Sequence, residues 1–326
     1  MLAILRVTFP FFALVACGFF AARRGLLPLQ AIPGLNTFVL FFALPCMLYR
    51  FGSSTPIAVL LDPALALVYL VSALTMVALV VVLTRNAQRG GHIGWNDAAM
   101  GALVGAFPNT GFMGVPLLVA FLGAASVGPA ILTIVIDIVL TSSLCIALSR
   151  LDRGSGDAWA AVRSALAGVA SNPMPWSILL GAVASAGGWM LPAPMAATVG
   201  LLADSASPVA LFTLGAVLAR SHLLAQQDAA HAVPWQDFVP IALAKLLLHP
   251  VLLLGLAYGG RAFGLPLDPA AITAVVLVAA LPSAGNVTLL AERFGANNGR
   301  IARIILVATV GAFFTFSATV ALLLDR

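Results

Sequence analysis

Two asparagines interrupt strongly apolar stretches of the sequence, and each lies close to a proline and a glycine. Asn109 belongs to "AFPNTGFMGVPLLVAF", residues 106–121, and Asn286 belongs to "LPSAGNVTLL". An amide offers hydrogen-bond donors and acceptors without the cost of burying a charge. It therefore suits either contact with a ligand or capping of the half-helix that follows the interruption. The sequence favours ligand contact and leaves capping open as the alternative.

The neighbours of these asparagines suit an opened helix. A proline removes a backbone donor and clashes with the preceding turn, while a glycine lets another backbone approach closely. Hydroxyl groups beside the asparagines add further hydrogen-bonding atoms, and the positive ends of half-helices favour an anion between them. The substrate-binding candidates are Pro108, Asn109, Thr110, Pro282, Ser283, Gly285 and Asn286.

Three ionisable residues lie inside other apolar stretches. Asp137 stands alone in "TIVIDIVLTSS", and Lys245 and His249 in "LAKLLLHPV" share one helix face at a spacing of four. An unpaired charge at the centre of a bilayer costs a few kcal/mol, so these groups must be paired, neutral or in contact with water. Either they form a static buried ion pair, or they lend charge to a substrate cavity and exchange a coupled proton.

Composition defines the environment of these residues. The chain has 326 residues, of which 62% are hydrophobic and 8% charged, and its mean hydropathy is +1.09. So few charges cannot cover a water-facing surface, which indicates an all-α integral membrane protein. Its basic residues stand between apolar blocks rather than along one face, so no nucleic-acid partner is expected. The three cysteines and four histidines lack metal-ligand spacing, so neither a metal nor a cofactor is expected.

Ten stretches are long and apolar enough to cross a bilayer as helices. They are residues 2–22, 32–49, 63–84, 96–122, 124–149, 173–191, 195–219, 238–259, 269–294 and 301–324. The longest gap, residues 150–172, contains apolar residues at helical spacing and predicts a short helix on the membrane surface.

The distribution of positive charge predicts the orientation. With both termini outside, eleven of the sixteen basic residues fall on inner loops and four on the outer side. Arg300 is counted among the inner loops, and Lys245 lies within a span. The alanine- and arginine-rich composition and the short loops favour a bacterial inner membrane with periplasmic termini.

The sequence also predicts a duplication. Pro108 and Pro282 interrupt the fourth and ninth spans at a separation of 282 − 108 = 174 residues, and Pro45 and Pro208 lie in the second and seventh spans at 208 − 45 = 163. Five spans are an odd number, so the second set enters the bilayer inverted. The expected organisation is a five-helix repeat over residues 1–150, a cytoplasmic loop over 151–172 and a second repeat over 173–326. Paired helix breaks near mid-membrane point to a transporter binding site.

These motifs resemble those of the auxin efflux carrier family over nearly the whole chain. "PNTGFMGVPLL" resembles the family's fourth-span motif, and "LPSAGNVTLLAERFGAN" its ninth-span motif. The resemblance implies that broken helices four and nine cross at mid-membrane, with the first, second, sixth and seventh spans as a scaffold and the rest as a moving domain. It also implies elevator-like motion, a homodimer, and organic anions such as auxin or dicarboxylates as substrates.

The predicted function is secondary transport of a small mono- or dicarboxylate, driven by membrane potential or coupled to protons. An enzyme is not expected, since Ser283 lacks the G-x-S-x-G setting of a serine nucleophile. An ion or solute channel and a transporter-like receptor are the alternatives. Two further residues of the predicted scaffold have expected places: Asn36 beside the cavity, and Asp204 near the membrane interface rather than in the cavity.

Overall fold

The computed structural model describes residues 2–55, 62–86, 93–151, 173–227 and 233–324. Within these ranges the regular elements are helices, apart from one isolated β-bridge. The surface helix expected within residues 150–172 falls almost entirely outside the described part of the chain.

Each of the ten predicted stretches contains helix. The first five contain α1 (Leu2–Arg23), α2 (Ile32–Phe38), α3 (Leu44–Ser54), α5 (Pro63–Asn86), α6 (Trp95–Ala106), α7 (Val115–Leu122), α8 (Val127–Ile136) and α9 (Ser142–Leu148). The second five contain α11 (Pro173–Gly187), α12 (Ala193–Gln227), α13 (Val239–Leu243), α14 (His249–Ala262), α15 (Pro269–Ala280), α16 (Val287–Phe294) and α17 (Asn298–Leu324).

Seven helical stretches of the described chain are long and apolar enough to cross a membrane. Two shorter apolar helices, Thr110–Leu122 and Pro269–Ala280, belong to the interrupted fourth and ninth stretches. Large apolar side chains such as Leu201 and Phe314 point outward, as expected where the surrounding solvent is lipid. The chain is an integral membrane protein.

Four of the stretches contain a five-residue π-helical turn. The turns are Val39–Ala43, Thr110–Gly114, Asp137–Thr141 and Ala244–Leu248. A π-turn widens the helix and is frequent at functional sites. One turn directly follows the fourth-stretch interruption, and two others contain the buried ionisable residues Asp137 and Lys245.

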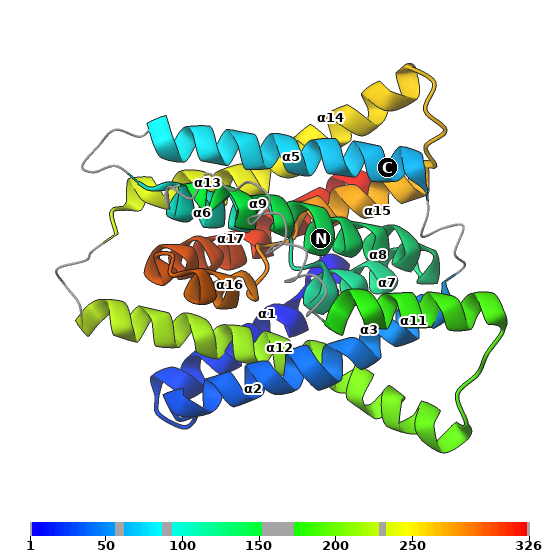
Figure 1. Cartoon of the computed structure of the whole chain (residues 1–326), viewed down its shortest axis with the longest axis horizontal. Helices are drawn as coiled ribbons and strands as arrows, with labels where there is room; N and C mark the ends of the chain where they lie inside the picture. The colour runs from blue at the N-terminus through cyan, green and yellow to red at the C-terminus, as the bar shows by residue number, and fades with distance from the viewer. Residues whose placement is uncertain (1, 56–61, 87–92, 152–172, 228–232, 325–326) are drawn as a thin grey trace.

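The helices lie in two groups (Figure 1). α1, α2, α3, α11 and α12 form one group, shown in blue and light green, and the remaining helices form the other. Both broken stretches, α6 with α7 and α15 with α16, belong to the second group. α12 and α1 pack against α17, so the two groups share one apolar core.

Glycines allow unusually close packing in the first group. A Cβ atom at Gly18 of α1 would overlap the carbonyl oxygen of Phe212 in α12, and one at Gly215 would overlap that of Val15. The same arrangement joins α3 to α11. There a Cβ at Gly52 would lie 2.7 Å from the carbonyl oxygen of Ile178, and one at Gly181 would overlap that of Tyr49. These backbones approach as closely as small residues permit in membrane helix pairs.

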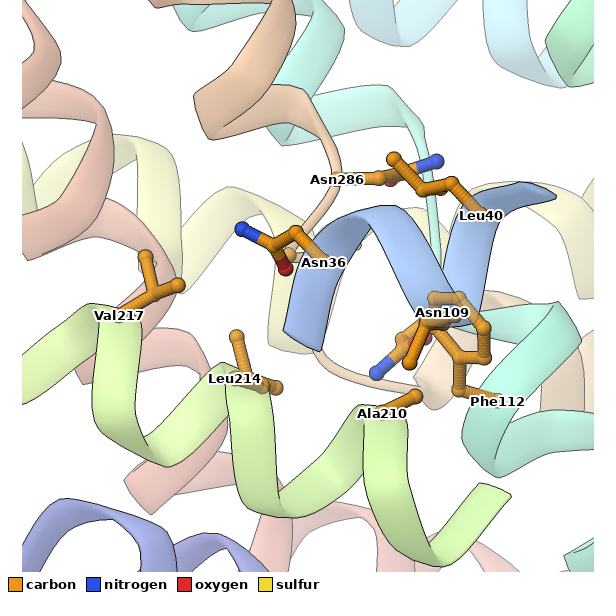
Figure 2. A pocket seen from close by; sticks show the side chains of 10 residues that line it. Asn36, Leu40, Asn109, Phe112, Ala210, Leu214, Val217 and Asn286 are labelled. Atoms are coloured by element: carbon orange, nitrogen blue, oxygen red, sulfur yellow. The ribbon is translucent and has the colours of Figure 1, made fainter. Parts of the chain in front are cut away.

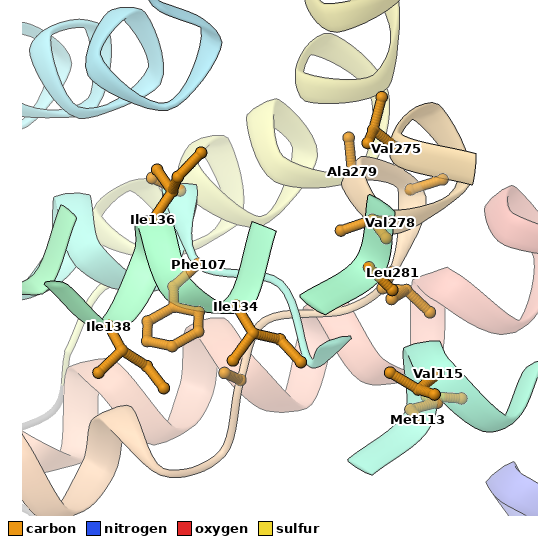
Figure 3. Packing of buried hydrophobic residues seen from close by; sticks show 14 of the residues in the cluster. Phe107, Met113, Val115, Ile134, Ile136, Ile138, Val275, Val278, Ala279 and Leu281 are labelled. Carbon is orange, nitrogen blue, oxygen red and sulfur yellow. The ribbon is translucent and has the colours of Figure 1, made fainter. Parts of the chain in front are cut away.

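Apolar side chains fix the broken helices in the second group (Figure 3). Phe107, directly after α6, packs among buried isoleucines of the fifth stretch, Ile134 and Ile138. Met113, after the first break, and Leu281, directly before the second, are equally buried. The irregular backbone is therefore enclosed by protein, as a helix break at membrane depth requires.

Arg300 differs from its expected place in an inner loop. It lies in the first turn of α17 with 3% of its surface exposed. Its guanidinium donates to the carbonyl oxygen of Asp97 at 2.8 Å and to that of Asp237 at 3.1 Å, and also reaches the hydroxyl of Thr84. Hydropathy marks arginine as a loop residue, but five guanidinium donors allow it to join the ends of several helices.

Candidate functional site

The two helix interruptions meet each other. The backbone N–H of Asn109 donates to the carbonyl oxygen of Pro282 at 2.8 Å, and that of Ala284 donates to the carbonyl oxygen of Phe107 at 3.0 Å. These bonds form an isolated antiparallel bridge centred on Pro108 and Ser283. The two broken stretches thus satisfy part of each other's freed backbone groups.

Neither asparagine caps its half-helix through its side chain. Asn109 precedes the π-turn that leads into α7, and Asn286 precedes α16, but no side-chain capping bond forms at either position. Buried polar atoms normally have a hydrogen-bond partner. Here four such atoms lack one within the described protein: Asn109 Nδ2, Thr110 Oγ1, Ser283 Oγ and Asn286 Oδ1. This leaves a cluster of polar atoms with unused bonding capacity.

A pocket lies between these interruptions and the first group of helices (Figure 2). α12 contributes Ala210, Leu214 and Val217, and the second stretch contributes Asn36 with its apolar neighbours. The pocket's full lining is Asn36, Val39, Leu40, Asn109, Phe112, Ala210, Leu214, Val217, Gly285 and Asn286. The space in it that the centre of a water-sized sphere can occupy is about 30 Å³. Since one water needs roughly 10–15 Å³ of such space, the pocket holds only a few water-sized groups.

A second pocket of about 30 Å³ borders the same interruptions. Leu44, Leu48 and Met174 line it from the first group, and Ile134 and Ile138 line it from the fifth stretch. The interruptions themselves contribute Phe107, Pro108, Asn109, Thr110, Gly111, Phe112, Ala284 and Asn286. Three of its residues, Asn109, Phe112 and Asn286, also line the first pocket.

The predicted binding residues therefore gather at one place, with different exposure to the pockets. Asn109 and Asn286 border both pockets, Gly285 borders the first, and Pro108 and Thr110 border the second. Pro282 and Ser283 lie in the bridge and border neither of these two pockets.

The three ionisable candidates are fully buried but do not border either pocket. The hydroxyl of Tyr69 donates to Asp137 Oδ2 at 2.7 Å, and the hydroxyl of Thr141 donates to Asp137 Oδ1 at 3.2 Å. Lys245 Nζ donates to the carbonyl oxygen of Ala279 at 2.7 Å and lies 3.0 Å from His249 Nδ1. Asp137 and Lys245 do not form an ion pair with each other.

The scaffold residues singled out from the sequence occupy different places. Asn36 borders the first pocket, as expected. Asp204 forms an ion pair with Arg50 at 2.6 Å, with both side chains well exposed, and borders neither pocket. Among the residues that the structure describes, no group of three histidine, cysteine or acidic side chains is placed to hold a metal. His92 and His231 lie outside that part.

In this membrane protein two interrupted apolar helices meet, and their amides lack partners at the meeting point. This arrangement is typical of membrane proteins that handle solutes. Comparison with known proteins agrees. A family model described as "Membrane transport protein" matches residues 3–320, and the chain belongs to this family, the auxin efflux carrier family.

Two relatives illustrate this membership. A "Putative malonate transporter" of Rhizobium meliloti (strain 1021) is 30% identical over 318 residues, covering 95% of this chain and 92% of the relative. The "Uncharacterized transporter YfdV" of Escherichia coli (strain K12) is 27% identical over 297 residues, covering 87% and 86%.

Sequence reasoning missed several participants. Tyr69, which binds Asp137, and Phe112 and Leu214, which line the first pocket, are ordinary residues of apolar helices. The position of Phe112, three residues after Asn109 in the same interruption, was the one available signal. The partners Tyr69 and Leu214 come from distant stretches, and only the packing of the helices brings them together.

Proposed function

We propose that this protein is a secondary transporter that moves a small carboxylate by alternating access, with the binding site where the interrupted fourth and ninth stretches meet. The observation that carries the proposal is the set of four unpartnered polar atoms at two paired helix breaks. Unsatisfied polar groups inside a membrane protein cost free energy, so they persist where they serve a ligand.

The architecture that we propose is ten membrane helices in two inverted five-helix repeats. The glycine contacts support it through a common offset. Adding 163 to Gly18 gives Gly181, and subtracting 163 from its contact Phe212 gives Tyr49, the contact of Gly181. The same operation converts the pair Gly52 and Ile178 into the pair Gly215 and Val15. Contacts that map onto each other in this way are expected of a two-fold axis between repeats.

The bridge between the breaks fits the same symmetry. Adding 175 to Asn109 gives Ala284, and subtracting 175 from Pro282 gives Phe107, so one backbone bond maps onto the other. Pro108 maps onto its own partner Ser283. We therefore place the axis at this bridge and propose that the fourth and ninth helices cross there.

The site chemistry favours an anion with a hydrogen-bonding carboxylate. No lysine, arginine or histidine lines either pocket, so the positive charge must come from backbone dipoles. The half-helices that begin after Asn109 and Asn286 present their N-terminal ends at the break, and the N-terminal end of a helix carries partial positive charge. The amide of Asn109 adds donors at 2% exposure, and carboxylate oxygens accept such bonds. The name of the Rhizobium relative, a malonate transporter, is consistent with a dicarboxylate.

The size of the pockets supports a carrier over a channel. Each offers about 30 Å³, and three residues, Asn109, Phe112 and Asn286, line both. A substrate larger than a few waters needs the two groups of helices to move apart. We propose that α1, α2, α3, α11 and α12 are the fixed scaffold and that the second group moves as an elevator. The glycine positions at which one helix backbone meets another, Gly18, Gly52, Gly181 and Gly215, lie within the first group and support this division.

The remaining features of the proposal follow from charge and from the family resemblance. We propose a bacterial inner-membrane location with both termini outside, and a homodimer. Transport is driven by membrane potential, or by a proton for which Asp137 and His249 are the buried titratable candidates.

Reconstitution in proteoliposomes tests the function directly. We expect saturable uptake of radiolabelled malonate that unlabelled internal malonate accelerates, since counterflow requires a carrier. Competition by unlabelled mono- and dicarboxylates then defines the substrate class. Conductance without counterflow would replace the carrier by a channel. Absence of uptake, and of thermal stabilisation by any carboxylate or indole acid, would reject the anion proposal.

The site is tested with two matched asparagines. Asn109→Ala removes an amide that borders both pockets, whereas Asn298→Ala removes another whose Oδ1 is also buried and unpartnered but borders neither pocket. We expect the first variant to lose uptake and stabilisation by substrate, and the second to keep both. Equal behaviour of the two would place the binding site elsewhere.

A further inference from the structure

The side chain of Lys245, which belongs to the π-turn Ala244–Leu248, packs against the C-terminal end of α15, the half-helix that precedes the second break. Its side chain is fully buried, and its Nζ donates to the carbonyl oxygen of Ala279 at 2.7 Å. Ala279 is the penultimate residue of α15, which ends at Ala280 before the interruption. The last carbonyl groups of a helix have no partners within it and carry partial negative charge. The ammonium thus neutralises a helix end inside the membrane protein.

The other contacts of Lys245 leave its positive charge without a directly bonded carboxylate. An ammonium has donors only, so His249 Nδ1, at 3.0 Å, accepts its second bond. Asp137 is bound instead by the hydroxyl groups of Tyr69 and Thr141. Within the described residues the one ion pair joins Arg50 and Asp204. The closest acceptor of Lys245 is therefore the helix-end carbonyl.

The π-turn Ala244–Leu248 contains Lys245 and packs against α15. Because Lys245 borders neither pocket, it does not contact a substrate bound there. It acts through α15, whose end leads within a few residues to the bridge and to Asn286.

We propose that Lys245 is a positioning residue whose ammonium serves as a built-in monovalent cation at the end of α15. In secondary transporters the C-terminal ends of half-helices at membrane depth coordinate Na⁺ or a proton, and an ammonium at the same place neutralises the same partial negative charge. Here the side chain of Lys245 lies at that position, with its Nζ 2.7 Å from the carbonyl oxygen of Ala279. The binding site at the break therefore forms without Na⁺, and transport is Na⁺-independent. This inference rests on the proposed function for its transport readout only.

The experiment separates charge from hydrogen bonding and from packing. Lys245→Gln keeps an N–H donor for the carbonyl of Ala279 and loses the charge, Lys245→Met keeps the length alone, and Lys245→Ala opens space for a small cation. Ser317→Ala is the matched control. Ser317 is 2% exposed and its hydroxyl donates to Phe313 within α17, away from the break.

Malonate uptake into proteoliposomes is measured in Na⁺ and in N-methylglucamine. We expect wild-type uptake to be the same in both media. In Lys245→Gln and Lys245→Met the KM rises about tenfold or more, because the end of α15 loses its charge. Ethylammonium or Na⁺ restores part of the uptake of Lys245→Ala and leaves Ser317→Ala unaffected. Wild-type dependence on Na⁺, or a normal KM in Lys245→Gln, would overturn the proposal.

A second readout does not need a transported substrate. The Tm of Lys245→Ala rises with ethylammonium or Na⁺, and the Tm of the wild type and of Ser317→Ala does not. If the wild type takes up no carboxylate, the proposed function fails while this measurement still tests the cation site. A folded Lys245→Ala protein whose Tm responds to no cation would reject the site even if the wild type transports malonate. If Lys245→Ala does not fold, Lys245→Gln decides through its KM.

Discussion

The two helix breaks share a sequence pattern but are supported differently. In each break a proline is followed three residues later by a glycine, Pro108 and Gly111 in the first and Pro282 and Gly285 in the second. Each break also donates one backbone hydrogen bond to the bridge. The helix before each break closes with a backbone bond, from the N–H of Phe107 to Leu103 in α6 and from the N–H of Leu281 to Val278 in α15, but a π-turn follows the first break. The second is supported from outside by Lys245, and no π-turn follows it.

The difference extends to burial. Asn109 is 2% exposed and its neighbour Thr110 is 1% exposed, whereas Asn286 and Gly285 are only partly buried. A donor in a desolvated setting contributes more to binding than one that water reaches. A two-fold axis relates the backbones in our proposal, but the substrate meets an asymmetric pair. We infer that the first break provides most of the affinity and the second provides shape.

The asparagines offer the strongest test of this asymmetry. A hydrogen bond to a charged ligand contributes about 1.5–3 kcal/mol, which corresponds to roughly tenfold to hundredfold in affinity. We expect Asn109→Ala to raise the KM of malonate uptake by this amount. Asn286→Ala, at the more hydrated position, should raise it less than about tenfold.

Thermal unfolding of the same variants supplies the control. Neither side chain caps a helix, so the loss of about 0.5–2 kcal/mol that follows removal of a cap is not expected. An unchanged or higher Tm together with a raised KM identifies a binding residue. A lower Tm with an unchanged KM would show that the asparagines only support the backbone, and an equal KM change would remove the asymmetry.

The paired glycines give a smaller contrast. A Cβ at Gly285 would lie 2.5 Å from Leu214 Cδ1, and one at Gly111 would lie 3.7 Å from Leu44 Cδ1. Neither glycine has a positive φ, so alanine is excluded at neither by backbone conformation. Leu214 lines the first pocket and must shift in Gly285→Ala. Overpacking of this kind destabilises a protein by about 1–3 kcal/mol.

Uptake should therefore fall about threefold to tenfold in Gly285→Ala and remain near the wild-type value in Gly111→Ala. Initial rates at matched protein density in the proteoliposomes measure this. The partner variant Leu214→Ala makes room for the new methyl group and should recover uptake in the Gly285→Ala background. Equal losses at both glycines would show that shape is not set by the second break.

The sequence predicted the helical stretches and the two breaks because both depend on local chemistry. Apolar length and the prolines at 108 and 282 are readable one residue at a time, and the ten expected stretches all contain helix. The contacts of Lys245 were not predictable in this way. Spacing suggested His249 as its neighbour, which is confirmed, and proximity of the fifth and eighth spans left Asp137 open as an ionic partner, which it is not. The carbonyl partner, Ala279, is an ordinary alanine on another helix.

Two further limits have physical causes. Whether the asparagines cap was undecidable from residue type, since the same amide suits both roles, and side-chain geometry was needed to show that neither caps. The burial of Arg300 required knowledge of Asp97, Asp237 and Thr84 as its partners, and these come from three other segments. Long-range pairing, rather than local preference, determined each of these outcomes.

The two unpartnered hydroxyl groups at the breaks give the smallest expected effect. Thr110 borders the second pocket, whereas Ser283 lies in the bridge and borders neither pocket. A neutral hydrogen bond contributes about 0.5–1.5 kcal/mol, so Thr110→Val, which keeps the side-chain shape, should raise the KM about two- to fivefold. Ser283→Ala should leave the KM unchanged. Because both variants remove an unsatisfied buried hydroxyl, neither should lower the Tm. If Ser283→Ala changes the KM more than Thr110→Val, the substrate reaches the bridge itself, and the second break rather than the first provides the closer contact.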